Sequence, residues 1–474
     1  MPNLSSSVEE LRAATSALES VGPQGAAAET TGRFIVTFRP EAAAEGAQLL
    51  ASAAGLRTAS ASDYNESAVT FESLGDADAL LLPDIGIAVV TGEPDQMNRV
   101  TEATTAESPV LAVEPEYYIY AMATPILSPV PEEERQESGE GQFALSAEAV
   151  SYLMGYRDAA NHITQTLLAG SGGGGAGAAP APGVGAAAFN ETLITWGLQA
   201  TRVNTSRRSG AGIRIAVLDT GFDMNHPDFA GRTKIGASFV SGQSVQDGNG
   251  HGTHCIGTAS GPRVSPVNPR YGIAYQSSIF AGKVLSNAGS GTDATILAGI
   301  NWAVANGCPV ISMSLGRGAQ VGEPFPMSYE TAARIALQRG CLIIAAAGND
   351  SNRSSGVFRA VSHPASCPSI MAVGAIDSAF RIANFSNRAI NLNGGRVDIV
   401  GPGVNVRSTW PMPTRYRTIS GTSMATPHVA GIAALYAQSS AALRGAALWQ
   451  RLIATARNIV SIPAVDDGAG LVQA

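Results

Sequence analysis

Short apolar runs and amphipathic stretches alternate through the second half of the chain, from about residue 191 onward. The apolar runs are rich in β-branched residues and too short for helices, so they predict buried strands, at 213–219, 277–285, 309–315, 341–348 and 370–375. The stretches between them predict helices at 292–307 and 327–340. This alternation favours an α/β fold with a parallel sheet covered on both faces, which binds ligands at the carboxyl ends of its strands.

The first quarter of the chain has a different pattern, with shorter alternating runs. Strands are predicted at 33–38, 68–75, 85–93 and 110–122, and helices at 41–55 and 93–103. The pattern predicts a small α+β domain, with a sheet on one side and two helices on the other.

The segment between these two parts differs from both in composition. Residues 125–142 are rich in Pro and Glu, 143–168 predict a single helix, and 169–188 are nearly all Gly, Ala and Pro, typical of a flexible tether. We therefore divide the chain into a flexible N-terminal segment (1–32), a small α+β domain (33–122), a linker (123–190) and a large α/β domain (191–474).

Acidic and basic residues are unevenly distributed. Residues 1–122 carry 18 Asp and Glu against 5 Lys and Arg, whereas residues 191–474 carry 13 against 23. These opposite net charges favour docking of one part on the other. The basic residues occur singly, without interleaved aromatics, so we expect no nucleic-acid partner. No run of eighteen apolar residues occurs, so we expect no membrane span.

Two further features bear on location and on metals. The first thirty residues lack the apolar core of a secretory signal, so we expect a cytoplasmic protein or export by a non-Sec route. The four cysteines, Cys255, Cys308, Cys341 and Cys367, lack metal-site spacing and favour buried thiols, although a Cys341–Cys367 pair stays open. His251 and His254 lack the acidic partner of a zinc motif, so zinc is not expected.

The segment GTSMATPHVAG, 421–431, predicts a helix that begins next to Ser423. Pro427 is tolerated only near a helix start, where backbone N–H groups have no intrahelical partner. Ser423 would then lie at the positive end of a helix dipole, which suits a nucleophile with an anionic transition state. An isolated serine at this position would more often be a helix cap.

Three other polar residues end predicted strands or begin predicted helices: Asp219, His251 and Asn349. Singly, an Asp or Asn there is commonly a cap or turn residue. Together with Ser423 they supply a nucleophile, a base, a carboxylate that orients the base, and an amide donor for an oxyanion. The set as a whole predicts nucleophilic acyl transfer.

Five segments resemble the signature segments of the subtilisin-like serine proteases: VLDTGFDMNHPDF, DGNGHGTHCIGT, ISMSLG, AAAGND and GTSMATPHVAG. The resemblance covers about residues 193–460 and implies a doubly wound parallel sheet and serine endopeptidase activity with no cofactor for the chemistry. It implies that Ser423 attacks the scissile carbonyl, His251 transfers the proton and Asp219 holds the imidazole. Asn349 and the Ser423 backbone N–H would stabilise the oxyanion.

The resemblance also implies where a peptide substrate lies. One edge of the cleft would be Ser290 and Gly291, the other Ser314, Leu315 and Gly316, and Ala346, Ala347 and Gly348 would complete an apolar P1 pocket. No acidic cluster occurs in these segments, which favours large neutral P1 side chains over dibasic sites. The implied partners are peptide or protein substrates, and we expect a monomer.

Residues 33–122 resemble the propeptide-inhibitor domain of the same family, a ferredoxin-like α+β domain. The tail Tyr117–Met122 would then lie in the cleft like a product, with self-cleavage after Met122 and Ile119 in the P4 pocket. The intervening linker leaves cleavage within 169–190 as an alternative. Cys255 resembles the thiol beneath the catalytic histidine in the proteinase K branch, which predicts sensitivity to mercurials; a buried packing residue is the alternative.

The chain departs from the family pattern at the calcium loop, which is not recognisable in 261–274. Asp228 matches one common calcium ligand of the family, and a capping carboxylate is the alternative. Two other functions stay open: a pseudoprotease that binds peptides in the same cleft, and a protease dedicated to maturing one peptide.

Overall fold

The computed structural model describes residues 29–63, 70, 74–105, 107–122, 189–391 and 393–474. We call residues 29–122 the N-terminal region and residues 189–474 the C-terminal region. The predictions for residues 1–28 and for most of the linker lie outside the described residues, as does most of the strand expected at 68–75.

The C-terminal region is built on a seven-stranded sheet of order β14-β13-β12-β10-β6-β8-β7. All neighbouring strands are parallel. The strands are β6 (Arg214–Asp219), β7 (Lys234–Ser238), β8 (Ser278–Lys283), β10 (Val310–Met313), β12 (Leu342–Ala346), β13 (Met371–Ile376) and β14 (Ile399–Pro402). The predicted parallel α/β fold is confirmed. Of the seven strands, only the two at the sheet edges, β7 and β14, were not predicted.

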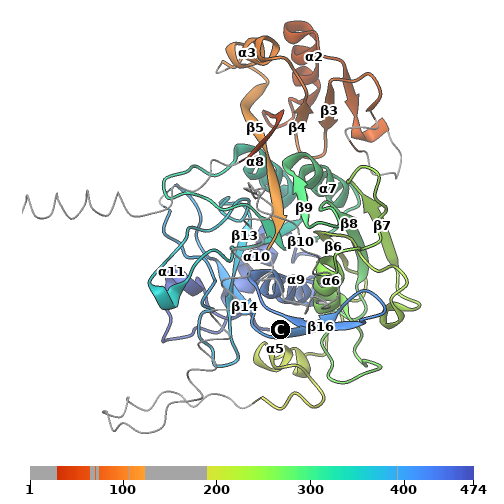
Figure 1. The fold of residues 1–474 in the computed structure, drawn as a ribbon, viewed down its shortest axis with the longest axis vertical. Helices are drawn as coiled ribbons and strands as arrows, with labels where there is room; N and C mark the ends of the chain where they lie inside the picture. The colour runs from red at the N-terminus through yellow and green to blue at the C-terminus, as the bar shows by residue number, and fades with distance from the viewer. Residues whose placement is uncertain (1–28, 64–69, 71–73, 106, 123–188, 392) are drawn as a thin grey trace, which may run out of the picture.

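Helices cover both faces of this sheet. In Figure 1, α7 and α8 lie on one side of it and α6 and α9 on the other. The helices are α5 (Trp196–Ala200), α6 (His251–Ser260), α7 (Asp293–Ala305), α8 (Met327–Gln338), α9 (Thr422–Ser439), α10 (Gly445–Thr455) and α11 (Ala464–Asp467). An antiparallel hairpin of β15 (Val406–Thr409) and β16 (Tyr416–Ile419) completes the region. Among the described residues, we find no helix with the length and apolar character that a membrane span requires.

The N-terminal region has a sheet of order β5-β1-β4-β3-β2. Its elements are β1 (Thr30–Phe38), α2 (Ala43–Ala54), β2 (Thr58–Ser60), β3 (Ala79–Leu82), β4 (Ile87–Val90), α3 (Pro94–Glu102) and β5 (Val110–Ala121). Apart from the short β2, this is the β-α-β-β-α-β order of ferredoxin-like domains. The predicted strand 85–93 is β4, whereas β3 was not predicted. Thr70, Leu74 and Gly75 are not in a strand.

Side chains on the two faces of the N-terminal sheet have different partners. Along β4, Ala88 and Val90 belong to an apolar cluster with Leu50 of α2 and Met97 of α3. Residues on the opposite face belong to the large apolar cluster of the C-terminal region, namely Ile35, Leu80, Leu82, Ile85, Ile87 and Val89. The sheet therefore lies between its own two helices and helices α7 and α8, as Figure 1 shows.

Strand β5 is long enough to reach beyond its own sheet. Its last residues lie between β9 (Ser290–Thr292) and β11 (Leu315–Gly316), both in the C-terminal region, and pair antiparallel with each. This pairing brings Met122, the residue after β5, to the carboxyl ends of the parallel strands.

Candidate active site

Asp219 is the last residue of β6, which lies beside both β8 and β10 near the middle of the sheet. The chain leaves β6 toward β7 and β8 on one side and later returns to β10 on the other, so the ends of these strands border a switch point where ligands bind. Asp219 Oδ1 lies 2.7 Å from His251 Nδ1, with both side chains buried. The same oxygen accepts the Thr220 N–H at 2.7 Å.

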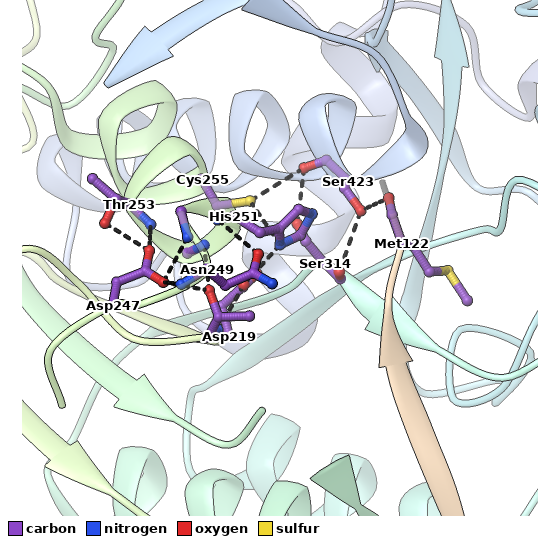
Figure 2. A network of polar contacts seen from close by, with 12 residues as sticks. Met122, Asp219, Asp247, Asn249, His251, Thr253, Cys255, Ser314 and Ser423 are labelled. Carbon is purple, nitrogen blue, oxygen red and sulfur yellow. Dashed lines mark hydrogen bonds and ion pairs between the residues drawn. The ribbon is translucent and has the colours of Figure 1, made fainter. Parts of the chain in front are cut away.

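His251 is the first residue of α6, and the start of this helix is fixed by Asp247. Asp247 Oδ1 accepts the Gly250 N–H at 2.8 Å, and Oδ2 accepts the Thr253 N–H at 2.9 Å (Figure 2). Gly250 has a φ of +107°, and a Cβ there would lie 2.3 Å from the Trp410 ring, so only glycine fits. Sequence analysis missed Asp247, although an Asp shortly before a helix is a known capping signal.

Burial and the neighbouring carboxylate act in opposite directions on His251. Burial disfavours the imidazolium, but the charge and hydrogen bond of Asp219 outweigh it and raise the pKa of His251 well above its usual value. Its Nε2 is buried without a hydrogen-bond partner. The ring is therefore basic, with one nitrogen held by Asp219 and the other able to accept a proton.

His254, the second histidine of HGTH, is not part of this pair. Its Nε2 lies 3.0 Å from the Val406 carbonyl oxygen, and burial lowers its pKa to about 3. Asp219, His251 and Cys255 each offer a ligand atom within 4.8 Å of the others. Burial raises the pKa of the Cys255 thiol, which therefore stays protonated near neutral pH and is a poor metal ligand.

Ser423 is the second residue of α9, so the helix begins where the sequence predicted. Its carbonyl oxygen would normally accept from the N–H four residues later, but that residue is Pro427, which has none. Ser314 Oγ donates to this oxygen at 2.8 Å, and Cys255 Sγ lies 3.6 Å from it. Two side chains from other elements therefore hold the Ser423 backbone, a role that sequence analysis did not assign to either.

The Ser423 hydroxyl points toward Met122 (Figure 2). Ser423 Oγ is in short contact with the Met122 carbonyl oxygen and donates to the Ser314 carbonyl at 3.2 Å. Asn349 Nδ2 donates to the same Met122 oxygen at 2.9 Å. Both the N–H and the hydroxyl of Thr422 donate to Asn349 Oδ1 at 2.9 Å, which fixes the amide with its nitrogen toward Met122.

The predicted walls of the cleft contact the end of β5. Ile119 pairs with Gly291, Tyr120 with Ser290 and Gly316, and Ala121 with Leu315. The Met122 N–H donates to the Ser314 carbonyl at 3.1 Å. A Cβ at Gly316 would lie 2.3 Å from Met122 Cε, so Gly316 borders the Met122 side chain.

The last three predicted cleft residues form one run beside this site. Ala346 and Ala347 are fully buried. Gly348 N–H donates to Thr422 Oγ1 at 3.3 Å, just before Asn349.

Asp228 lies away from this site, and protein donors occupy both of its oxygens. Oδ2 accepts the hydroxyls of Tyr271 at 2.6 Å and Tyr416 at 2.8 Å. Oδ1 accepts Arg415 Nη2 at 2.9 Å. The Asp228 side chain is fully buried, so its charge is balanced by a guanidinium of the same chain. The four cysteines are free and buried, which confirms the expected thiols.

Carboxylates of β5 complete two helices of the C-terminal region. Glu116 Oε1 accepts the Ala294 N–H at the start of α7, at 3.0 Å. Glu114 accepts the N–H groups of Met327 and Ser328 at the start of α8, at 2.8 and 2.9 Å. Negative charge at a helix N-terminus is stabilising, so these contacts favour docking of the two regions. Their role could not be seen in the sequence because the partners are distant.

Comparison with known proteins agrees with this geometry. The Subtilase family model matches residues 210–471, more than half of the chain. The chain belongs to the subtilase family. Subtilisin DY of Bacillus licheniformis is 40% identical over 263 residues, covering 55% of this chain and 90% of that protein. Subtilisin Savinase of Lederbergia lenta is 40% identical over 289 residues, covering 59% and 97%. Subtilisin E of Bacillus subtilis (strain 168) is 39% identical over 264 residues, covering 55% and 64%. The chain is thus a subtilisin-like serine peptidase.

Proposed function

We propose that this subtilase hydrolyses peptide bonds with Ser423 as nucleophile, His251 as general base and Asp219 as the carboxylate that orients it. Support comes from the 2.7 Å contact between Asp219 and His251 Nδ1 and from the buried, unpartnered Nε2. Ser423 Oγ attacks the carbonyl carbon and its proton passes to Nε2. The protonated imidazole then gives that proton to the leaving amine, and water hydrolyses the acyl-enzyme.

Asn349 is the donor that we assign to the oxyanion, together with the Ser423 backbone N–H. The observation that carries the proposal is that one carbonyl oxygen, that of Met122, contacts both Asn349 Nδ2 and Ser423 Oγ. Thr422 holds the amide in place before any substrate arrives, so little reorganisation is needed as charge develops. A peptide-binding pseudoprotease would not need this arrangement.

The N-terminal region acts as the inhibitory propeptide, with autocleavage between Met122 and Ala123. Its last residues occupy the cleft as the P4 to P1 residues of a product, with Ile119 fully buried at P4. Glu114 and Glu116 anchor it to α8 and α7. The alternative cleavage sites in 169–190 lie outside the described residues. The domain boundaries that we propose are 33–122 and 191–474.

The P1 pocket accepts large neutral side chains, as Met122 does beside Gly316. The substrates of the enzyme are peptides and proteins. General proteolysis and maturation of a single peptide would use the same site. A profile of cleavage sites distinguishes these two functions.

We infer that Asp228 is a structural carboxylate and not a calcium ligand. Calcium is bound by oxygen donors with free lone pairs, and a guanidinium in contact with Asp228 Oδ1 would repel a divalent cation. The chemistry of the triad itself needs no cofactor.

Autoprocessing tests the proposed function. Purified full-length chain is incubated and followed by intact mass and N-terminal sequencing, next to a Ser423→Ala variant. We expect a new N-terminus at Ala123 in the wild type alone, and labelling by a fluorophosphonate at Ser423. In subtilisin, loss of the nucleophile costs about 10⁶-fold in kcat, and we expect the same order here. An unlabelled wild type, or a Ser423→Ala chain that still processes itself, would contradict the assignment.

A further inference from the structure

Between the helix-capping residues Glu114 and Glu116 and the residues that pair with the two cleft strands, β5 contacts the C-terminal region through Tyr117. Pairing with β9 ends at Tyr118, and pairing with β11 ends at Tyr120. Tyr117 precedes both, at the position of a P6 residue when Met122 is P1. Two side chains of the C-terminal region nevertheless contact it, one from the end of each cleft strand.

Asp293 follows β9 and begins α7, where the chain turns away from the cleft. Its Oδ2 accepts the Tyr117 N–H at 2.8 Å. The β9 backbone pairs with β5 only as far as Tyr118, and the Asp293 carboxylate binds the next backbone N–H, that of Tyr117. Its other oxygen accepts the Tyr329 hydroxyl at 2.9 Å, so the side chain is held in place from the side opposite the peptide.

Arg317 follows Gly316, the last residue of β11. Its guanidinium carbon lies 4.3 Å from the centre of the Tyr117 ring, within the range of a cation–π interaction. Glu323 fixes the guanidinium from behind through a 2.9 Å ion pair. Burial opposes the charge of Glu323, but His363, the Gln320 N–H and Arg317 outweigh it and hold its pKa at about 2. The arginine side chain is only 11% exposed.

Exposure along the end of β5 alternates as expected for an extended peptide with one face in a cleft. Tyr118 and Tyr120 are 36% and 40% exposed, whereas Ile119 is fully buried and Tyr117 half-buried. The residues that face inward are therefore Ile119 at P4 and Tyr117 at P6. Both contact residues of the C-terminal region.

We propose that Asp293 and Arg317 form a sixth subsite, S6, which binds the backbone N–H of the P6 residue and selects an aromatic side chain there. The proposal rests on the proposed function, because it takes residues 117–122 as a substrate-like strand. The preferred substrates are extended polypeptide segments with at least six residues before the scissile bond and an aromatic residue at the first of them.

The test uses the autoprocessed enzyme and quenched fluorogenic peptides that share the acyl-side sequence Tyr-Tyr-Ile-Tyr-Ala-Met. One peptide carries Ala at P6, one carries Leu, and one lacks P5 and P6. We expect kcat/KM for P6 Tyr to exceed that for P6 Ala by about 3- to 10-fold, with Leu closer to Ala. Replacing the P6 amide by an ester, which removes its N–H, should cost about tenfold.

Variants separate stacking on Arg317 from general damage. In Arg317→Met the ratio of kcat/KM for P6 Tyr over P6 Ala should fall to about one. This ratio does not depend on how much of the variant folds, because both peptides meet the same preparation. Arg381→Met is the matched control, since this arginine is 77% exposed and lies outside the cleft walls; its ratio should equal that of the wild type.

The outcomes distinguish the two proposals. If the wild type cleaves none of the peptides, the proposed function fails. If it cleaves all of them with equal kcat/KM, the enzyme is a protease without an S6 subsite, and the contacts of Tyr117 serve propeptide docking alone. A P6 preference that persists in Arg317→Met would also overturn the assignment to Arg317.

Discussion

The two regions of this chain bury their sheets in different ways. The seven-stranded sheet of the C-terminal region is covered on both faces by helices of the same region. The five-stranded sheet of the N-terminal region has its own helices on one face only, and its other face joins the apolar cluster of the C-terminal region. One region thus has a complete core, whereas the other depends on its neighbour to cover one face of its sheet.

On the inhibitory role that we propose for the N-terminal region, this difference explains how it could bind firmly and still be removed. Buried apolar area stabilises the docked region, but one face of its sheet would be uncovered once it left. An inhibitor that is less stable once detached is open to proteolysis by the enzyme it has released. The difference in burial would therefore make release of the N-terminal region irreversible, because the detached region is degraded before it can bind again.

The strongest test of the comparison places one cavity in each region of an uncleaved Ser423→Ala chain. Leu82→Ala removes a side chain of the shared face, and Ile344→Ala removes one from β12 in the C-terminal sheet; each should cost about 2–5 kcal/mol. Amide hydrogen exchange is the measurement. We expect Leu82→Ala to lower protection in the strands of the N-terminal region alone, including its own strand β3, whereas Ile344→Ala lowers it in both regions. If Leu82→Ala lowered amide protection in β12 as much as Ile344→Ala does, the C-terminal region would depend on the N-terminal region, and the comparison would be wrong.

A second test asks whether Arg415 is the counter-ion of the buried Asp228 carboxylate in the C-terminal region, in place of a bound calcium ion. Arg415→Met removes the guanidinium that balances the buried Asp228 carboxylate, so it should lower the unfolding free energy by more than loss of an exposed arginine does. The exposed Arg381→Met should cost about 0–1 kcal/mol. Thermal unfolding with and without calcium measures both. Calcium stabilisation of the wild type that disappears in Asp228→Asn would show that Asp228 binds the metal after all.

The third and smallest effect concerns pH at the boundary of the two regions. With Tyr117 in place, burial and the nearby charge of Glu116 together raise the pKa of Asp293 to about 7. The hydrogen bonds from Tyr117 and Tyr329 and the charge of Arg317 lower this pKa but do not outweigh burial. Without a peptide over it, we expect Asp293 to have a pKa closer to that of an ordinary carboxyl group. At a given pH the peptide-bound enzyme therefore has Asp293 protonated more often than the free enzyme does. Affinity is then complete below about pH 4 and declines as pH rises toward about 7.

The measurement is inhibition of the autoprocessed enzyme by the product peptide Tyr-Tyr-Ile-Tyr-Ala-Met, acetylated at its N-terminus so that the nitrogen facing Asp293 stays an amide N–H. From pH 5 to pH 8 we expect its affinity to fall about a hundredfold more in the wild type than in Asp293→Asn. The raised pKa of His251 acts equally in both proteins, so the difference between them isolates Asp293. Parallel pH profiles would contradict this role.

The parallel sheet could be predicted, and the four groups of the proposed active site could be located, because their signals are local. Buried strands such as β6 and β12 are continuous apolar runs, with Asp219 and Asn349 at or after their ends, and His251 and Ser423 begin helices. Edge strand β7 contains Lys234 and Gly236 and did not show such a run. Strand β3 was missed because its apolar run is only four residues long; Leu80 and Leu82 are buried against the C-terminal region and Ala79 against α2 and α3.

Most of the supporting residues could not be predicted, because they act through partners far away in the sequence. Thr422 orients Asn349, and Asp293 meets Tyr117 across 176 positions of chain. Asp247 is the exception: it caps the start of α6 through Gly250 and Thr253, so its signal is local and was missed. Asp228 was assigned from the motif alone, where calcium and a cap were both open. Only the fold shows that Arg415, 187 positions later, contacts its carboxylate.

The proline at the start of α9 has a further consequence. Because Pro427 leaves the Ser423 carbonyl without its helical donor, the serine is fastened by Ser314 after β10 and by Cys255 in α6. Three separate elements must reach their final places before the hydroxyl is aimed. A chain in which these elements have not yet met would therefore have the helix but not the fixed backbone at Ser423, the residue that we propose as nucleophile.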